Sequence, residues 1–174
     1  MGLERKAAPE ARVRLEDGCV IAGYASRFGE VDGGGDVVEP GAYCDGLARM
    51  AAEGRRVKML WQHDPARVIG VWDEVREDAR GLWVKGRLLT EVALGREAAA
   101  LVEAGALDGL SIGYTVKRAT RDAEGRRHLR ELDLWEVSLV TFPMLRSARV
   151  GAKAARRREL AGALQAARAE LAGL

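Results

Sequence analysis

Apolar and polar residues recur along this chain with two periods, one of two residues and one of three to four. A period of two is typical of a strand with one buried face, and the longer period is typical of an amphipathic helix. The shorter period predicts strands at 13–15, 20–26, 57–63, 68–75, 82–89, 110–117 and 129–142. The longer period predicts helices at about 42–53 and between Thr90, as N-cap, and Gly105. This order predicts an α+β domain whose core is an antiparallel β-sheet or barrel of about seven strands with flanking helices.

Two strands carry details that bear on function. Alternation in 57–63 places His63 on the same face as Trp61, at the end of the strand. The second half of 129–142 is apolar on both faces, which is typical of a central strand, and alternation places Glu136 on the face of Leu134. An unpaired carboxylate among apolar side chains is costly, so Glu136 needs a basic partner.

The chain divides into three parts. Residues 1–10 form a polar leader, 11–150 the folded domain, and 151–174 a tail with five basic and two acidic side chains. In the tail, leucine and alanine recur at steps of four and three, so it is expected to form a basic amphipathic helix. That helix packs either on its own domain or on a partner.

Composition and length exclude several classes of protein. A length of 174 residues fits one domain, and a net charge of +2 does not indicate a general nucleic-acid binder. Two cysteines without a CxxC pair favour a reducing compartment and exclude a zinc scaffold. No signal sequence and no apolar run of 18 residues is present, so we expect a soluble intracellular domain.

Three residue types suggest nucleophilic chemistry. A histidine is the commonest general base near neutral pH. His128 lies in a charged run and is interpreted as solvated, so His63 is the better candidate, although it could equally be a structural histidine at the rim of its strand. Ser111 lies between Gly109 and Gly113 at the start of a strand, where small neighbours would let a substrate carbonyl approach it. Glu136 either orients His63 or forms an ordinary ion pair, with Asp133 as its substitute. The Gly33–Asp36 run lacks the ending of a phosphate-binding loop and is interpreted as a flexible loop beside a site.

Four segments in this order resemble the tailed-phage prohead proteases. They are GYASRFGEVDGGGDVVEPGAY, KMLWQHDPARVIGVW, ALDGLSIGY and LDLWEVSLVTFPM, and the resemblance spans residues 19–150. These proteases are capsid-maturation serine peptidases related in fold to the herpesvirus assemblins, so a herpesvirus-protease-like fold is implied. Gene transfer agents carry similar proteases, and this chain could come from one.

The resemblance implies a role for each candidate residue. His63 would be the general base, Ser111 the nucleophile and Glu136 the third member, with Asp133 or His128 as alternatives for that third position. The implied function is a serine endopeptidase that cleaves the scaffolding segment of the major capsid protein inside the prohead, in the host cytoplasm. It implies no cofactor and no metal. The expected partners are the capsid protein and a second copy of the chain, not a membrane or nucleic acid. The rival hypothesis is a non-catalytic capsid-assembly module that binds the scaffold.

Overall fold

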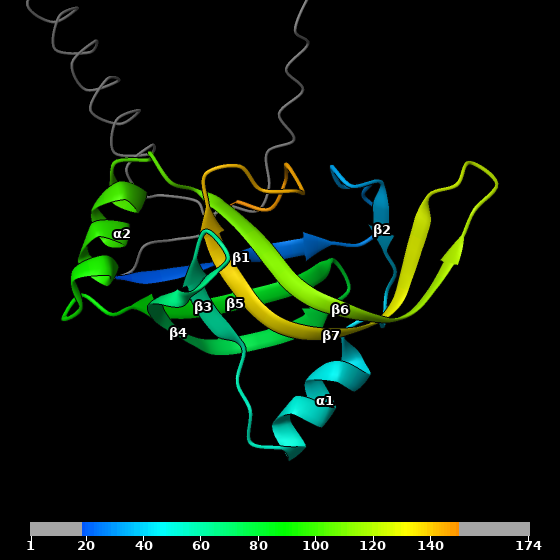
Figure 1. The fold of residues 1–174 in the computed structure, drawn as a ribbon, viewed down its shortest axis with the longest axis horizontal. Helices are drawn as coiled ribbons and strands as arrows, with labels where there is room; N and C mark the ends of the chain where they lie inside the picture. The colour runs from blue at the N-terminus through cyan, green and yellow to red at the C-terminus, as the bar shows by residue number, and fades with distance from the viewer. Residues whose placement is uncertain (1–18, 150–174) are drawn as a thin grey trace, which may run out of the picture.

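The computed structural model of the chain describes residues 19–149. The predicted strand at 13–15, the leader at 1–10 and the helical tail at 151–174 lie outside the described residues. The elements, in chain order, are β1 (Val20–Arg27), β2 (Asp36–Val38), α1 (Cys44–Ala52), β3 (Lys58–Trp61), β4 (Asp64–Asp78), β5 (Gly81–Leu88), α2 (Ala93–Glu103), β6 (Gly109–Arg121) and β7 (Arg127–Val140) (Figure 1). All but β2 correspond to predicted elements. The count of seven strands agrees with the prediction because β2 was not foreseen and 13–15 is not described.

The seven strands form one curled sheet in the order β1-β5-β4-β3-β7-β2, and β6 pairs with the other edge of β7. Most neighbours are antiparallel, but β2 and β3 both run parallel to β7. The expectation of a wholly antiparallel sheet is therefore wrong, and the sheet is mixed. Alternation along a strand reports which face is buried and carries no information on the direction of its neighbour.

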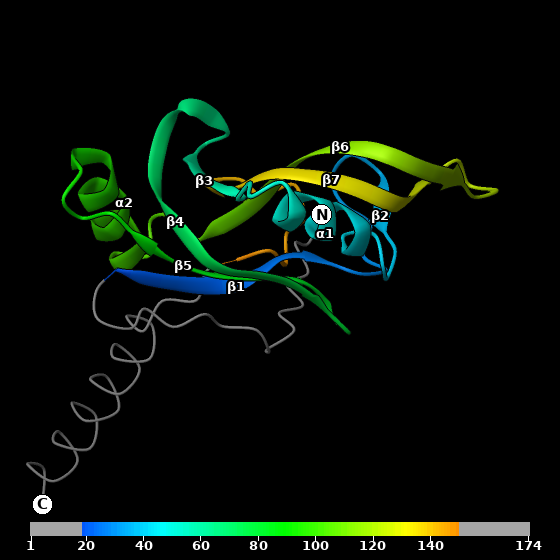
Figure 2. The same cartoon turned by 90° about the horizontal axis from the view of Figure 1, so that it is seen from below.

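The curl of the sheet makes a half-barrel around the core. Viewed from below, β6 and β7 form one wall, β1 and β5 form the opposite wall, and α1 lies between the walls at the near end of the half-barrel (Figure 2). Strands β1 and β6 approach each other, yet no backbone pairing joins them in the described part of the chain, so the barrel is not closed. Leucines of β6 and β7 contribute much of the fully buried core: Leu110, Leu129, Leu132, Leu134 and Leu139. Strand β7 is central, as predicted.

Helix α2 packs against β4 and β5, and its start differs from the prediction. The helix begins at Ala93 after Val92, and no side chain caps it. The backbone N–H of Val92 donates to Leu89 O, so a turn occupies the residues around Thr90 and delays the helix. The expectation that Thr90 is the N-cap is therefore wrong. Neither helix in residues 19–149 is long and apolar enough to cross a membrane.

The glycine-rich segment before β2 is fastened at several points. Asp32 Oδ1 accepts hydrogen bonds from the N–H groups of Gly34 (2.8 Å) and Asp36 (2.9 Å), as in other turns closed by an aspartate. The buried carboxylate of Asp36 pairs with the guanidinium of Arg127 and accepts a bond from the Tyr114 hydroxyl (3.3 Å). The bond from Arg127 holds the pKa of Asp36 below its usual value. The segment thus joins β2 to the β6–β7 hairpin.

Helix α1 reaches the sheet through a glycine. A Cβ on Gly46 would lie 2.2 Å from the backbone oxygen of Leu132 on β7. Gly46 therefore permits a close approach of helix and strand that no larger residue allows.

We expect Gly46→Ala to destabilise the fold by about 1–3 kcal/mol, because the added methyl must push α1 away from β7. Helix propensity alone predicts the opposite sign, since alanine is better than glycine inside a helix by about 1 kcal/mol. Urea unfolding of the two proteins measures the sign directly. A more stable Gly46→Ala variant would show that the helix can move without cost.

Candidate active site

His63 lies in the turn between β3 and β4 and not on a strand. Gln62 and His63 have φ values of 52° and 62°, in the left-handed region that non-glycine residues rarely adopt. Strand β3 ends at Trp61, so the expectation that His63 shares a strand face with Trp61 is wrong. Because His63 lies in this turn, its imidazole does not follow the side-chain alternation of β3.

Strand β7 holds this unusual turn in place. The Gln62 N–H donates to Leu139 O (2.9 Å), and the Gln62 side chain bonds to Thr141. The His63 N–H donates to Ser138 Oγ (3.1 Å). Backbone strain of this kind persists where the surroundings over-determine it, and these bonds supply that restraint.

A β-bulge decides where Glu136 points. Gly113 pairs with Glu136 and Tyr114 pairs with Leu134, so β7 carries one extra residue, Trp135, at this place. The bulge breaks the alternation and puts Leu134 in the core and Glu136 on the opposite face. The expectation that Glu136 shares a face with Leu134 is therefore wrong. Its need for a basic partner is met on the outer face.

That partner is His63. Nδ1 of His63 lies 2.6 Å from Oε1 of Glu136, and the Ser138 hydroxyl donates to Oε2 of Glu136 (2.6 Å). The side chain of Glu136 is 11% exposed, whereas that of His63 is 42% exposed. A carboxylate only accepts, so Nδ1 carries the proton and Nε2 of the neutral ring is left as the basic nitrogen. The bond to Glu136 raises the pKa of His63 above its ordinary value, against the effect of burial.

Ser111 lies on β6 directly opposite Ser138. Because alternation is intact from this pair to the pair of Gly113 with Glu136, the side chains of Ser111, Ser138 and Glu136 leave the same face of the sheet. Directly opposed residues have Cβ atoms about 4.5–5.5 Å apart. The sheet therefore brings Ser111, Glu136 and the imidazole bound to Glu136 together, although no hydrogen bond joins Ser111 to His63 in the described structure.

Within residues 19–149, the edge of β6 that faces away from β7 pairs with no other strand, apart from a single bridge between Gly109 and Arg149. A cavity of about 310 Å³ opens between β1, the glycine-rich segment and β6, and Ser111 is among its lining residues. The opening of the half-barrel thus reaches the strand that carries the candidate nucleophile.

Close packing against β7 explains the glycines on either side of Ser111. A Cβ on Gly113 would lie 2.3 Å from Oε1 of Glu136, and one on Gly109 would lie 2.4 Å from the backbone oxygen of Val140. Both glycines make room for β7, which differs from the interpretation that they admit a substrate carbonyl. Gly113 in particular leaves the space that the Glu136 carboxylate occupies beside His63.

Gly113→Ala should displace the carboxylate of Glu136 from His63. We expect the pKa of His63 to fall towards its ordinary value, because the bond that raises it is broken, and we expect a loss of stability of about 1–3 kcal/mol. An NMR titration of the His63 ring measures the first effect and thermal unfolding the second. A His63 titration identical to that of the unmodified protein would mean that Glu136 keeps its position despite the added methyl.

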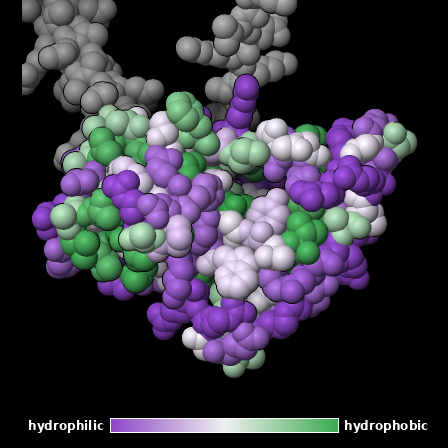
Figure 3. Space-filling model, viewed as in Figure 1, coloured by the Kyte–Doolittle hydropathy of each residue, from purple (hydrophilic) through white to green (hydrophobic). Residues whose placement is uncertain are grey.

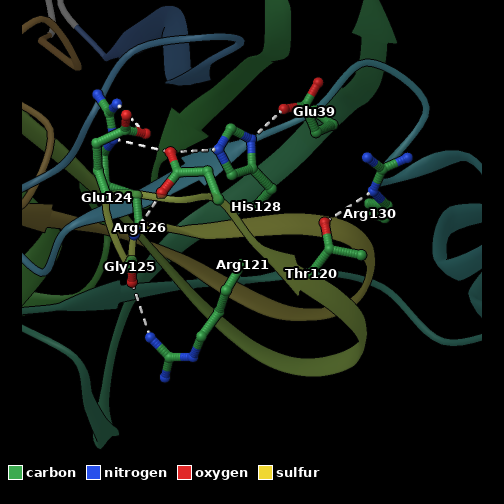
Figure 4. Close-up of polar contacts among 9 residues, drawn as sticks. Glu39, Thr120, Arg121, Glu124, Gly125, Arg126, His128 and Arg130 are labelled. Atoms are coloured by element: carbon green, nitrogen blue, oxygen red, sulfur yellow. Dashed lines mark hydrogen bonds and ion pairs between the residues drawn. The ribbon is translucent and has the colours of Figure 1, made fainter.

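The alternatives for the third member have other partners. Asp133 pairs with Arg49 (2.6 Å) and Lys117 (3.0 Å). His128 lies at the far end of the β6–β7 hairpin, with Nδ1 on Glu39 (2.6 Å) and Nε2 on Asp122 (3.1 Å) (Figure 4). Its pKa is raised by these two carboxylates, the bond to Glu39 being the larger cause. Neither residue contacts His63, so the geometry favours Glu136 over both.

Sequence reasoning missed Ser138. This residue is fully buried, accepts a bond from the backbone of His63 and donates one to Glu136. Its position two residues after Glu136 is the only signal for it, since a serine on a central strand is otherwise unremarkable. Within residues 19–149, no three His, Cys, Asp or Glu side chains converge in a way that could hold a metal ion.

The chain is similar in sequence to a known protein family. The model of the caudovirus prohead serine protease family matches residues 7–162, beyond the motif-bearing span at both ends. The prohead protease of enterobacteria phage HK97 is 32% identical over 136 residues, covering 76% of this chain and 59% of the HK97 protein. This chain thus spans less than two thirds of that relative's length.

Solved structures support the fold alone. The capsid assembly protease of bacteriophage T4 superposes with a TM-score of 0.59 at 16% identity, covering 70% of this chain and 80% of that one. The varicella-zoster virus protease superposes with a TM-score of 0.44 at 16% identity, covering 73% and 60%. At that score the herpesvirus-like part of the expected fold stays a prediction. On the extent of the family match and the identity to the HK97 protein, the chain belongs to the caudovirus prohead serine protease family.

Proposed function

We propose that this chain is a serine endopeptidase in which Ser111 is the nucleophile, His63 the general base and Glu136 the residue that orients His63. The observation that carries the proposal is the 2.6 Å contact between Glu136 Oε1 and His63 Nδ1, on the face of the sheet from which Ser111 projects. The contact leaves Nε2 as the basic nitrogen, as a general base beside a serine requires. Family membership supports the same assignment.

The reaction uses only these side chains and water. Ser111 Oγ attacks the peptide carbonyl while its proton passes to His63 Nε2, and the imidazolium is stabilised by the carboxylate of Glu136. The tetrahedral intermediate expels the amine, which takes the proton from Nε2 and leaves an acyl group on Ser111. A water molecule then loses its proton to Nε2 and attacks the ester, and Nε2 returns the proton to Ser111.

The proposed substrate is the scaffolding segment of the major capsid protein. The names of the HK97 prohead protease and the T4 capsid assembly protease point to capsid maturation in those phages. By analogy, this chain would act inside the immature capsid in the host cytoplasm, with the capsid protein as its partner.

Co-expression tests this function. The full chain is produced with the major capsid protein of the same genome, and new protein termini are mapped by mass spectrometry. We expect one set of new termini that removes a segment of the capsid protein, and none with the Ser111→Ala variant. An unprocessed capsid protein that still co-purifies with the unmodified chain would instead support the capsid-assembly module.

The pH dependence of cleavage should reflect the pairing of His63 with Glu136. The neutral ring is the base, and the bond to Glu136 raises the pKa of His63, so the acid limb of kcat/KM should lie above the ordinary pKa of a histidine. In Glu136→Gln the cause of the raised pKa is gone, and the limb should move to lower pH. A pH profile of peptide cleavage for both proteins measures the shift. Identical limbs would mean that His63 is not the titrating base.

A further inference from the structure

The far end of the β6–β7 hairpin extends away from the rest of the molecule (Figure 1). We call residues 117–130 the basic arm. It comprises the ends of β6 and β7 and the turn between them, and all residues from Lys117 to Arg121 are exposed. This end of the molecule is mostly hydrophilic in the space-filling view (Figure 3).

The arm has the opposite charge to the rest of the described chain. It holds six basic residues and two acidic ones, Asp122 and Glu124. The remaining residues between 19 and 149 hold 13 basic and 18 acidic residues. The small net charge of the whole chain therefore hides a basic arm on an acidic body.

Half of the basic residues of the arm are neutralised by a neighbour. Lys117 pairs with Asp133 (3.0 Å), Arg126 with Asp122 (2.9 Å), and Arg127 with Asp36. These pairs fix the shape of the arm and its attachment to β2, and they leave little positive charge for a partner.

The other three, Arg118, Arg121 and Arg130, have no carboxylate within ion-pair distance in the part of the chain that the structure describes. Figure 4 shows Arg121 bonded to Gly125 O (2.9 Å) and Arg130 to Thr120 Oγ1 (3.1 Å), neither of which carries charge. In the backbone register Arg118 lies opposite Glu131, whose carboxylate is bonded to Arg49. Arg130 reaches Thr120, which is on the same face of β6 as Arg118. Arg121 is three residues from Arg118 and leaves the other face, near Asp36. Two exposed guanidiniums, those of Arg118 and Arg130, are thus held on one face of a paired β-hairpin, where they can bind carboxylates.

The arm and the candidate active site share the same two strands. Arg118 follows Ser111 on β6 by seven residues. With a rise of about 3.4 Å per residue, the backbone of Arg118 lies about 24 Å along the strand from that of the serine. A substrate in extended conformation covers this distance with about seven residues.

We propose that the basic arm is a second binding site for the substrate, in which Arg118 and Arg130 take an acidic stretch of polypeptide located about seven residues from the cleaved bond. This proposal rests on the proposed function. Arg118 and Arg130 lie on the two strands of one hairpin and on one face of it, so they can bind neighbouring carboxylates of a single polypeptide. A polypeptide fits better than nucleic acid, because the acidic body beside the arm repels a long polyanion.

Peptide cleavage tests the proposal. One peptide carries the mapped cleavage sequence alone, and extended peptides add a block of four glutamates or four glutamines eight residues away, on either side. We expect the glutamate block on one side to raise kcat/KM about tenfold over the glutamine block, mostly through KM, as two exposed charge pairs allow. The gain should fall as salt is raised.

Two double variants locate the effect. In Arg118→Gln and Arg130→Gln combined, the gain from the glutamate block should disappear while the short peptide is cleaved at the normal rate. The control combines Arg56→Gln and Arg146→Gln, which changes the net charge equally elsewhere and should retain the gain. A gain lost in both variants, or in neither, overturns the proposal.

A binding measurement separates this proposal from the catalytic one. Fluorescence anisotropy with the Ser111→Ala protein needs no turnover, and the labelled glutamate peptide should bind about tenfold tighter than the glutamine peptide, only when the arm arginines are present. Equal binding of the two peptides would overturn the second site whether or not the chain is a protease. Tighter binding of a DNA oligonucleotide that depends on the same arginines would assign the arm to nucleic acid and also overturn it.

Discussion

Ser111→Ala and His63→Ala are each expected to lower kcat for peptide cleavage by a factor on the order of 10⁴ or more, and the double variant should be little worse than either. Ser111 supplies the attacking oxygen and His63 removes its proton, so each residue is of little use without the other. The rates are measured on one peptide substrate for the four proteins of the cycle.

Non-additive losses in the double variant are the evidence that Ser111 and His63 act together, because any two damaging substitutions could each lower the rate. Neither residue belongs to the hydrophobic core cluster, and His63 is substantially exposed, so the variants should unfold at temperatures close to that of the unmodified protein. Ordinary turnover in Ser111→Ala would contradict the serine mechanism. Losses that multiply in the double variant would mean that the two residues act independently.

Glu136→Gln is expected to lower kcat by a factor of about 10³–10⁴ while leaving KM nearly unchanged. The carboxylate at 2.6 Å from Nδ1 fixes the tautomer that leaves Nε2 free, and it stabilises the imidazolium that forms during attack. The amide of glutamine is neutral and can present its NH₂ group to Nδ1, which favours the wrong tautomer. Steady-state kinetics on the peptide substrate give both constants.

Asp133→Asn is the matched control, since it changes a carboxylate on the same strand. Asp133 pairs with Arg49 and Lys117, both partly exposed, so its loss should cost stability by about 1 kcal/mol or less and leave kcat unchanged. If Asp133→Asn proved the damaging change and Glu136→Gln the harmless one, the assignment of Glu136 would be wrong.

The sequence predicted the elements that depend on local patterning. Helix α1, the hairpin of β4 and β5, and the central position of β7 follow from apolar periodicity and from turn residues, which act over a few positions. The candidate residues His63, Ser111 and Glu136 could be singled out because they are scarce, or awkward in their surroundings, and because the motifs around them resemble a known family.

What the sequence could not predict depends on contacts between distant segments. The direction of β3 relative to β7 and the short strand β2 are set by pairing across the sheet. The bulge at Trp135 reverses the face on which Glu136 lies, and the left-handed turn at His63 is stabilised by Ser138 and Leu139, 75 or more residues away. The same two features bring His63 and Glu136 together, so the site is assembled where simple alternation fails.

A covalent serine probe identifies the nucleophile without relying on substitution of Ser111. A fluorophosphonate is added to particles assembled from the full chain and its capsid protein, and the modified residue is identified by peptide mass spectrometry. We expect a single adduct on Ser111 Oγ that blocks processing of the capsid protein and is absent from the His63→Ala protein. Continued cleavage of the capsid protein with Ser111 unmodified, or an adduct on another serine that abolishes cleavage, would contradict it.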